Sequence, residues 1–401
     1  MSFFIDHPHH KKLFENLATR LDSKLVCLPS NAPLVAPDST HDKLLQAIEQ
    51  RHIQFIEAKY ADGILSVKQH LKKWQRLGLS SNSIQRKFRR HKIRTQFRKW
   101  VHLFQNSEDT FIAAWCPVKP NRYLIFQAAK FCGKALIYFE DAPYPGFIIC
   151  DHSGINAGSS IPKSAKFYAD WFFKNEETVK KIAVRDLFEK LPQRKRSKDL
   201  RNGVLELGTL DWEKKVIYCP LQVPADTQIV LYGGWINSIH QFIKLIYNAS
   251  RHLPDGWQVA VREHPSSTIS FTKLLSELVD DRFAVYNQGT SKELLKQCSA
   301  VVTVNSSVGF HAFFCDKPVI TLGDSLWGFE PVAQVAENAE ALNHAFKSIE
   351  TSSFCQESRT AFLHYLFNEV FLSKAELEEI NNQTHPQLEL IKRKILLSKR
   401  M

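Results

Sequence analysis

The residues in this sequence that are best suited to catalysis or ligand binding lie in three short polar clusters, each directly after an apolar segment. The clusters are the acids Glu140 and Asp141 after residues 135–139, His264 with Pro265 after residues 257–261, and Ser306 with Ser307 after residues 301–304. A carboxylate acts as a nucleophile or a base, and a histidine binds phosphate or transfers a proton near neutral pH. Hydroxyl and backbone N–H groups at a helix start bind anions. Together these groups suit a reaction that expels a phosphate-bearing leaving group without a metal ion.

The serine cluster belongs to residues 300–322, which are predicted to form a strand, a loop, a helix and a second strand. Asn305, Ser306 and Ser307 occupy the loop where the strand ends and the helix begins. Gly309, in the first helical turn, would let a ligand or another backbone approach closely. The alternative, and the simpler one from the loop alone, is that a serine here is an ordinary helix N-cap.

The other two clusters also have structural alternatives. An acid pair after a strand is most often a turn or a cap, but open α/β sheets bind their ligands at the carboxyl ends of such strands. A single histidine more often satisfies a structural hydrogen bond, although His264 precedes a proline and is therefore held in an extended or turn backbone. Two further loops could line a ligand site. One contains Gln222, and the other contains Asn156, Ser159 and Ser160.

Several common motifs are absent from the sequence. There is no Asp-x-Asp triplet after a strand, no Gly-x-x-x-x-Gly-Lys-Ser/Thr loop and no Gly-x-Gly-x-x-Gly loop. These absences argue against a metal–diphosphate clamp, ATP hydrolysis and nicotinamide chemistry. No metal and no cofactor are therefore expected.

The elements that must position these clusters alternate between strand and helix, which predicts parallel sheets covered by helices. The chain has 401 residues, enough for two α/β domains. A polar, basic stretch around residues 193–212 is the predicted linkage. We therefore expect an N-terminal domain at 1–205, a second domain at 206–340, and C-terminal helices at 341–401 that pack back on both. Helices are expected at 1–22, 65–77, 83–104, 360–371 and 374–397, among others.

The net charge of +12 is concentrated in three basic clusters. They run from Arg86 to Lys99, from Arg194 to Arg201 and from Lys392 to Arg400. Such clusters attract nucleic acid or an anionic membrane, although a solvated helix face is an equally good interpretation of any one of them. Phe88, Phe97 and Trp100 interleave with the first cluster, which fits an amphipathic helix on a membrane leaflet or a stripe facing the core.

The cysteine and hydropathy patterns indicate in which cellular compartment the protein is expected. The eight cysteines are scattered, and no secretory signal or membrane-spanning run is recognisable. We therefore expect a cytoplasmic protein, with a possible peripheral contact to the inner membrane through the cluster from Arg86 to Lys99. Nucleic acid is not an expected partner, since the basic residues lie outside any recognised nucleic-acid module.

Taken together, several motifs resemble those of the bacterial capsule polysaccharide biosynthesis family, over about residues 105–330. They are Tyr138-Phe139-Glu140-Asp141, Gly154-Ile155-Asn156-Ala157, Ser159-Ser160-Ile161-Pro162, Pro220-Leu221-Gln222-Val223-Pro224, Arg262-Glu263-His264-Pro265, Val304-Asn305-Ser306-Ser307-Val308-Gly309 and Lys317-Pro318. The chain departs from the family pattern after the acid pair, where Ala142-Pro143-Tyr144-Pro145 stands in place of a glycine, an aromatic residue and an arginine.

The resemblance implies a GT-B glycosyltransferase architecture, with two Rossmann-like domains facing a cleft, and a β-Kdo transferase activity that uses CMP-Kdo. In that frame Asp141 is the nucleophile of a retaining reaction, with Glu140 beside it. The implied donor-binding residues are Gln222, Arg262, His264, Asn305, Ser306, Ser307 and Gly309, and His264 is also a catalytic candidate. Asn156, Ser159 and Ser160 would line the acceptor side of the cleft. The implied acceptor is a lipid-linked glycan or a lipopolysaccharide or capsule glycan.

Three alternatives stay open. The chain also resembles inverting GT-B sialyltransferases, which use CMP-Neu5Ac and share an acid pair, a His-Pro and a serine. A non-catalytic capsule assembly or export protein of the same fold would release no CMP and would tolerate loss of Asp141. Nucleic-acid binding through the first basic cluster is the third, and it predicts salt-sensitive affinity.

Overall fold

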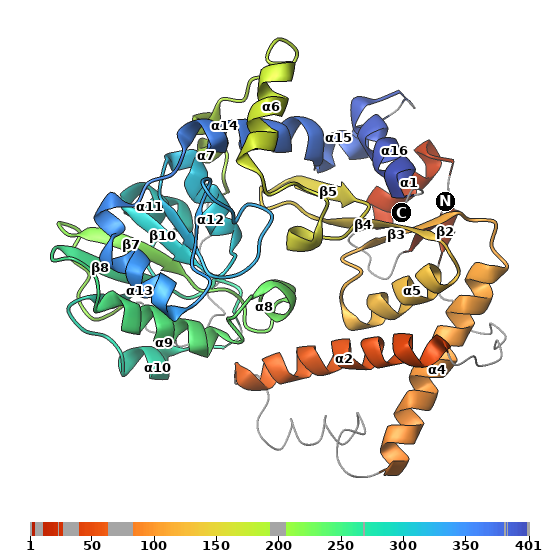
Figure 1. The fold of residues 1–401 in the computed structure, drawn as a ribbon, viewed down its shortest axis with the longest axis horizontal. Coiled ribbons are helices and arrows are strands. Elements are labelled where there is room, and N and C mark those ends of the chain that lie inside the picture. Colours follow the sequence, from red (N-terminus) through yellow and green to blue (C-terminus); the bar gives the residue numbers. More distant parts are fainter. Residues whose placement is uncertain are drawn as a thin grey trace.

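The computed structural model describes residues 2–4, 11–22, 24–26, 40–62, 83–192, 206–267, 269–380, 382 and 384–398. These residues form two α/β domains, each built on its own largely parallel sheet, with helices packed on the sheet faces (Figure 1). Residues lining cavities between the domains come from both sheets. The prediction of two Rossmann-like domains with a cleft between them, the GT-B arrangement, is therefore confirmed.

The first sheet has six strands in the order β13-β5-β4-β3-β1-β2. Their bounds are β1 Ser2–Phe4, β2 Lys24–Val26, β3 Phe111–Trp115, β4 Ala135–Asp141, β5 Phe147–Asp151 and β13 Phe371–Ser373. Strands β1 to β4 are parallel, whereas β5 runs antiparallel to β4 and pairs Ile148 with Asp141. The loop after the acid pair is consequently a β-hairpin connection, which holds Asp141 at the carboxyl end of β4.

Helices cover both faces of the first sheet. On one face α1 (Lys11–Arg20), α15 (Lys374–Glu379) and α16 (Pro386–Ser398) contribute apolar side chains to a core that includes Phe139 and Ile148. On the other face α2 (Thr40–Ala61), α4 (Ser83–Gln105) and α5 (Pro120–Phe131) enclose a second core. Burial on both faces explains the near-continuous apolar sequence of β3.

Helix α4 carries the first basic cluster, and its aromatic residues decide between the two interpretations of that segment. Phe97 and Trp100 are 1% and 2% exposed and pack in the core against α5. The interleaved aromatic stripe at these two positions therefore faces the protein and is not available to a membrane leaflet. The side chains of residues 83–90, Phe88 included, lie outside the described part. No helix among the described residues is both long and apolar enough to span a membrane.

The second sheet has seven strands in the order β12-β11-β10-β7-β8-β9-β6, all parallel to their neighbours except β6. The bounds are β6 Glu206–Leu207, β7 Lys215–Pro220, β8 Trp257–Arg262, β9 Phe283–Tyr286, β10 Ala300–Thr303, β11 Val319–Thr321 and β12 Gln334–Val335. Helices include α8 (Thr227–Tyr232), α9 (Ile239–Ser250), α10 (Thr272–Ser276), α11 (Ser291–Gln297) and α12 (Ser307–Ala312). The carboxyl ends of β7, β8 and β10 meet at one edge, so the polar residues that follow them lie together.

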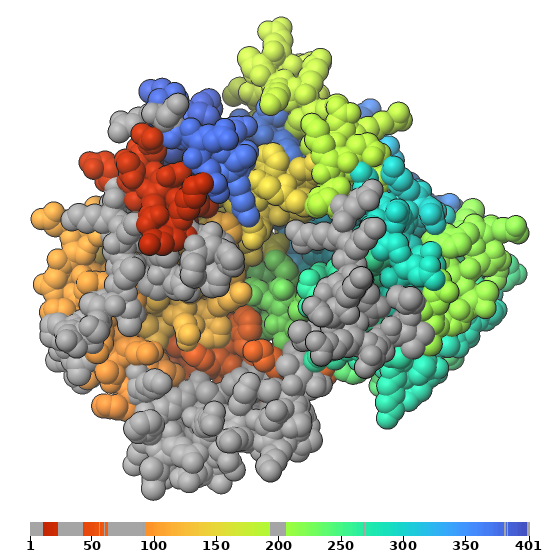
Figure 2. All heavy atoms as spheres, turned by 180° about the vertical axis from the view of Figure 1, so that it is seen from behind, coloured from red at the N-terminus to blue at the C-terminus, as the bar shows by residue number. Residues whose placement is uncertain are grey.

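The C-terminal segment returns from the second domain to the first. Helix α13 (Ala339–Lys347) packs on α9, and α14 (Gln356–Tyr365) packs on α6 (Ala165–Asn175). Helix α7 (Val184–Glu189) contacts the short 3₁₀ helix Phe313–Cys315 of the second domain. Strand β13 then joins the first sheet, and α15 lies against α1, as the adjoining blue and red surfaces in Figure 2 show. The segment at 341–401 was expected to consist of helices, and it contributes strand β13 to the first sheet as well.

Three element predictions were wrong. Residues 2–4 form β1 rather than the start of a helix, and Phe371, the predicted last residue of a helix, begins β13. Residues 374–397 form two helices, because Ser373 caps α15 and Pro386 begins α16. Three-residue apolar strands leave no periodic signal, so sheet pairing alone identifies them.

The helix expected at 65–77, the predicted linkage and the cluster from Arg194 to Arg201 fall largely or wholly outside the described residues.

Candidate active site

Two adjoining cavities lie between the domains and share a wall. The smaller cavity, of about 460 Å³, is lined mainly by the second domain, and the larger one, of about 560 Å³, draws more residues from the first. The residues common to both are Asp141, Ala142, Pro143, His264, Ser306 and Ser307. The fold thus brings members of all three polar clusters to one wall, although they come from different domains.

Asp141 is the last residue of β4 and faces both cavities. Its side chain is 61% exposed, and its carboxylate forms an ion pair with the Nζ of Lys374, which is the first residue of α15. The backbone of Lys374 donates to the carbonyl of Gly146 (2.9 Å), and its Nζ lies 5.6 Å from the centre of the Trp115 ring. Sequence reasoning missed Lys374, because the two residues lie 233 positions apart.

Glu140 lies beside Asp141 but lines the larger cavity and not the smaller one. Burial is the main reason why the pKa of its carboxyl rises to about 8. The negative charges of Asp226 and Asp141 add to the rise, and Lys119 opposes it. Glu140 is consequently protonated at neutral pH, so the pair divides into one exposed, ion-paired carboxylate and one half-buried carboxylic acid.

This raised pKa predicts a pH effect on stability. Between about pH 4.5 and pH 8 the folded protein binds a proton at Glu140 that the unfolded chain has lost, so this residue's contribution to stability falls as pH rises through that window. Replacing Glu140 with Gln should flatten the fall and raise the melting temperature at pH 8, as measured by a series of thermal scans. The matched control is Glu277→Gln, on the surface of the second domain; an equal effect there would contradict the assignment.

In the second domain, the end of β8 presents His264 to both cavities. Arg262 donates to the carbonyls of Gln288 and Gly289, both at 2.7 Å, and the Glu263 carboxylate accepts from the N–H of Phe271 at 2.7 Å. These two buried charges hold the surrounding loops. The Nδ1 atom of His264 accepts from the N–H of Ser266 (3.1 Å), which in a neutral ring leaves the proton on Nε2, the form that donates to a phosphate oxygen.

The loop after β10 is held by an amide pair. The Nε2 of Gln222 donates to Oδ1 of Asn305 (2.9 Å), and the backbone N–H of Asn305 donates to Oε1 of Gln222 (3.2 Å). The Nδ2 group of Asn305 also lies within bonding distance of three main-chain carbonyls, those of Gln228, Tyr232 and Asp324. Gln222 and Asn305 therefore fix the loop that carries the serines.

The two serines differ in what they do. The Oγ of Ser306 accepts from the N–H of Val308 (3.2 Å), so the N-cap interpretation holds for this hydroxyl. Ser307 begins α12, is exposed and lines both cavities. Gly309 is buried and lines neither, because a Cβ there would lie 2.5 Å from the Trp327 ring. The close approach that Gly309 permits is thus to a tryptophan side chain.

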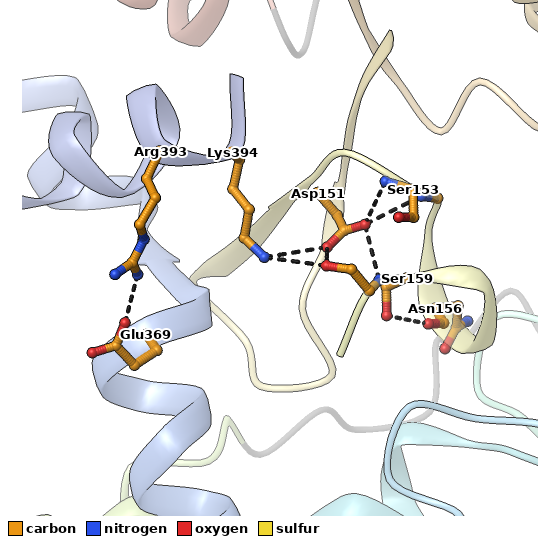
Figure 3. A network of polar contacts seen from close by, with 9 residues as sticks. Asp151, Ser153, Asn156, Ser159, Glu369, Arg393 and Lys394 are labelled. Carbon is orange, nitrogen blue, oxygen red and sulfur yellow. Dashed lines mark hydrogen bonds and ion pairs between the residues drawn. The ribbon is translucent and has the colours of Figure 1, made fainter. Parts of the chain in front are cut away.

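The loop after β5 contains Asn156, Ser159 and Ser160, and these three residues differ in whether they line a cavity. Figure 3 shows Asn156 and Ser159 in this loop. Asn156 lines the larger cavity. The Oγ of Ser159 donates to the carbonyl of Asn156 (2.6 Å), and Ser160 bonds through both its N–H (3.0 Å) and its hydroxyl (2.5 Å) to Asp151. Lys394 of α16 lies 3.4 Å from the same carboxylate. The two serines therefore organise the loop and do not line either cavity.

Further cavity residues carried no recognisable sequence signal. The larger cavity includes Lys119 and Arg122 at the start of α5, and Trp115 and Trp327. Contacts between the two domains include those of His311 and Asp62. Nε2 of His311 lies 2.8 Å from the carbonyl of Pro143, and the buried carboxylate of Asp62 accepts from the N–H groups of Ala225 (3.0 Å) and Ile239 (2.7 Å).

Comparisons with known proteins place this geometry in a wider context. The sequence profile described as "Capsule polysaccharide biosynthesis protein" matches residues 173–373. Protein FixF of Sinorhizobium fredii is 28% identical over 64% of this chain and 58% of its own length. The capsule polysaccharide export protein KpsS of Escherichia coli is 23% identical over 53% of this chain and 63% of its own length. The chain thus spans about three fifths of the length of these curated relatives.

The β-Kdo 2,7 transferase KpsC of Thermosulfurimonas dismutans is 15% identical over 66% of this chain and 79% of that chain, with a TM-score of 0.42.

Proposed function

The chain belongs to the capsule polysaccharide biosynthesis protein family, and from this premise we propose that it is a metal-independent glycosyltransferase. Its donor is CMP-Kdo, and its acceptor is a lipid-linked glycan or a lipopolysaccharide or capsule glycan. The observation that carries the proposal is the shared wall, where Asp141 of the first domain meets His264 and Ser307 of the second. A nucleophile on one side and phosphate-binding groups on the other are what transfer of an activated sugar requires.

Each of the two cavities binds one substrate, the CMP-sugar donor or the acceptor. The smaller cavity holds the CMP group, since it is lined by Tyr218, Ser291 and the β8 end. The larger cavity holds the acceptor, since its lining includes amide side chains and the two tryptophans Trp115 and Trp327, which suit a sugar. The basic face of α4, which includes the exposed Arg94, is the proposed contact to an anionic inner-membrane surface that supplies a lipid-linked acceptor.

In the proposed reaction the Asp141 carboxylate attacks the anomeric carbon of the donor. The bond from that carbon to the phosphate oxygen breaks, and CMP leaves with the electron pair. His264 and Ser307 stabilise the charge that grows on the phosphate in the transition state. An acceptor hydroxyl then displaces Asp141 and loses its proton to a base, with net retention of configuration.

The position of Glu140 favours one alternative, an inverting reaction. This carboxyl faces the larger cavity and not the smaller one, so in its ionised form it is placed to take the proton from an acceptor hydroxyl that attacks the donor directly. The anomeric configuration of the product distinguishes the two reactions. A non-catalytic role in capsule assembly or export, suggested by the name of KpsS, predicts no CMP release at all.

The proposal is tested by calorimetric titration with CMP, UMP and AMP. Wild type should bind CMP more tightly than the other two, and His264→Ala should weaken CMP binding by about tenfold, because one charge-assisted or phosphate-directed hydrogen bond is lost. Asn156→Ala, in the larger cavity, is the matched control and should bind CMP like wild type. Absence of CMP binding, or equal loss in both variants, would overturn the placement of the donor.

A further inference from the structure

Lys374 is the cation that the structure brings to the reacting carboxylate. It lines the smaller cavity and forms an ion pair with Asp141, which lines both cavities. Its side chain is 38% exposed, so the ammonium group is partly accessible from the cavity. The pair joins the C-terminal segment to the end of β4, and the hydrogen bond from the Lys374 backbone to Gly146 fixes the base of the side chain.

The other cations of the smaller cavity are committed to the protein. The guanidinium of Arg262 donates to the carbonyls of Gln288 and Gly289, both at 2.7 Å. The Nζ of Lys292 donates to the carbonyl of Glu189 (2.6 Å) and lies 3.1 Å from its carboxylate. Among the described lysines and arginines of this cavity, Lys374 is thus the one that contacts a carboxylate of the shared wall.

The chemistry of a sugar-acid donor places a second carboxylate at the same point. In a 2-keto sugar acid the carboxylate is bonded directly to the anomeric carbon, the atom that Asp141 attacks in the proposed reaction. A nucleophile within reach of that carbon therefore lies only a few ångströms from the donor carboxylate. Two like charges this close in a partly solvated site repel each other, and a cation between them offsets that repulsion.

We propose that Lys374 binds the carboxylate of the donor and so selects sugar acids over neutral sugars. In the free protein the ammonium holds Asp141, and in the donor complex it lies between Asp141 and the donor carboxylate. Lys374 is thus a specificity-determining residue for the donor. The inference rests on the proposed function, because it takes the donor to be a CMP-activated sugar acid.

The test compares a charged donor with its uncharged ester. Three ligands are titrated: CMP, whichever of CMP-Kdo and CMP-Neu5Ac binds more tightly, and the methyl ester of that donor. The proteins are wild type, Lys374→Met, Lys374→Arg and Lys12→Met. The last variant is a matched control, because Lys12 pairs with Glu378 of the same helix α15 (3.1 Å) and does not line either cavity. Wild type should prefer the acid to the ester by about tenfold or more.

Lys374→Met should bring that preference close to one while CMP affinity stays within about twofold of wild type, which also shows an intact fold. Lys374→Arg should keep a measurable preference, and Lys12→Met should match wild type. If Lys374→Met keeps the full preference for the acid over the ester, the inference is overturned but the proposed function stands. A loss of CMP binding in Lys374→Met has the same consequence, because it would make the residue structural. Failure of wild type to bind either donor overturns the proposed function, and the inference with it.

Discussion

Replacing Asp141 with Asn lowers the rate of CMP release by about a thousandfold or more, and leaves CMP affinity within about threefold of wild type. The amide keeps the shape of the side chain but cannot form a stable glycosyl ester, so the covalent step is lost while the smaller cavity is preserved. The donor should bind at least as tightly as before, since one of the two carboxylates facing Lys374 has been removed.

The matched control for this variant is Asp170→Asn. Asp170 is an exposed acid that pairs with Lys166 at 2.8 Å on α6 and does not line either cavity. It should release CMP like wild type. Stopped assays with CMP-Kdo over several donor concentrations separate the rate from the affinity. Wild-type rates in Asp141→Asn, together with a large loss in Glu140→Gln, would transfer the central role to Glu140 and favour inversion.

Replacing Asn305 with Leu destabilises the second domain by about 3 kcal/mol or more and abolishes detectable CMP binding. The substitution keeps the branched shape of the side chain but removes the Nδ2 donor that lies near the carbonyls of Gln228, Tyr232 and Asp324, and it leaves the Nε2 of Gln222 without its acceptor. Buried polar groups without partners cost about 1–3 kcal/mol each. The serine loop loses its support at the same time.

Denaturant unfolding followed by tryptophan fluorescence measures the stability change, and calorimetry measures the loss of CMP binding. Asn237→Ala is the control, because the Nδ2 group of that exposed side chain makes a long contact (3.5 Å) to the carbonyl of Trp235. It should change stability by less than about 0.5 kcal/mol. A stable Asn305→Leu protein that still binds CMP would show that the amide network does not hold the site.

The sequence was sufficient to predict where the polar clusters lie on the fold, for a physical reason. Buried parallel strands such as β8 and β10 read as continuous apolar runs, and residues directly after them must meet at the same edge of the sheet. The meeting of Asp141 with His264 and Ser307 follows from that rule, applied to two sheets that face each other.

The partners of those residues could not be predicted in the same way. Lys374 reaches Asp141, and Lys394 reaches Asp151, only because the C-terminal segment returns to the first sheet through the three residues of β13. Glycine at 309 suggests a close approach but does not say that Trp327 makes it. Likewise, the aromatic residues of α4 fit a membrane face or a core face equally well until α5 is seen to cover Phe97.

Whether the protein is a CMP-Kdo-dependent transferase is decided by CMP release from the purified wild-type protein, offered CMP-Kdo and, separately, CMP-Neu5Ac, with and without a capsule-type or lipopolysaccharide acceptor. We expect release that depends on the donor, is faster with CMP-Kdo and increases when the acceptor is present. Absence of release with either donor under all of these conditions, despite measurable CMP binding, would contradict a transferase role and leave a CMP-binding assembly protein of the same fold.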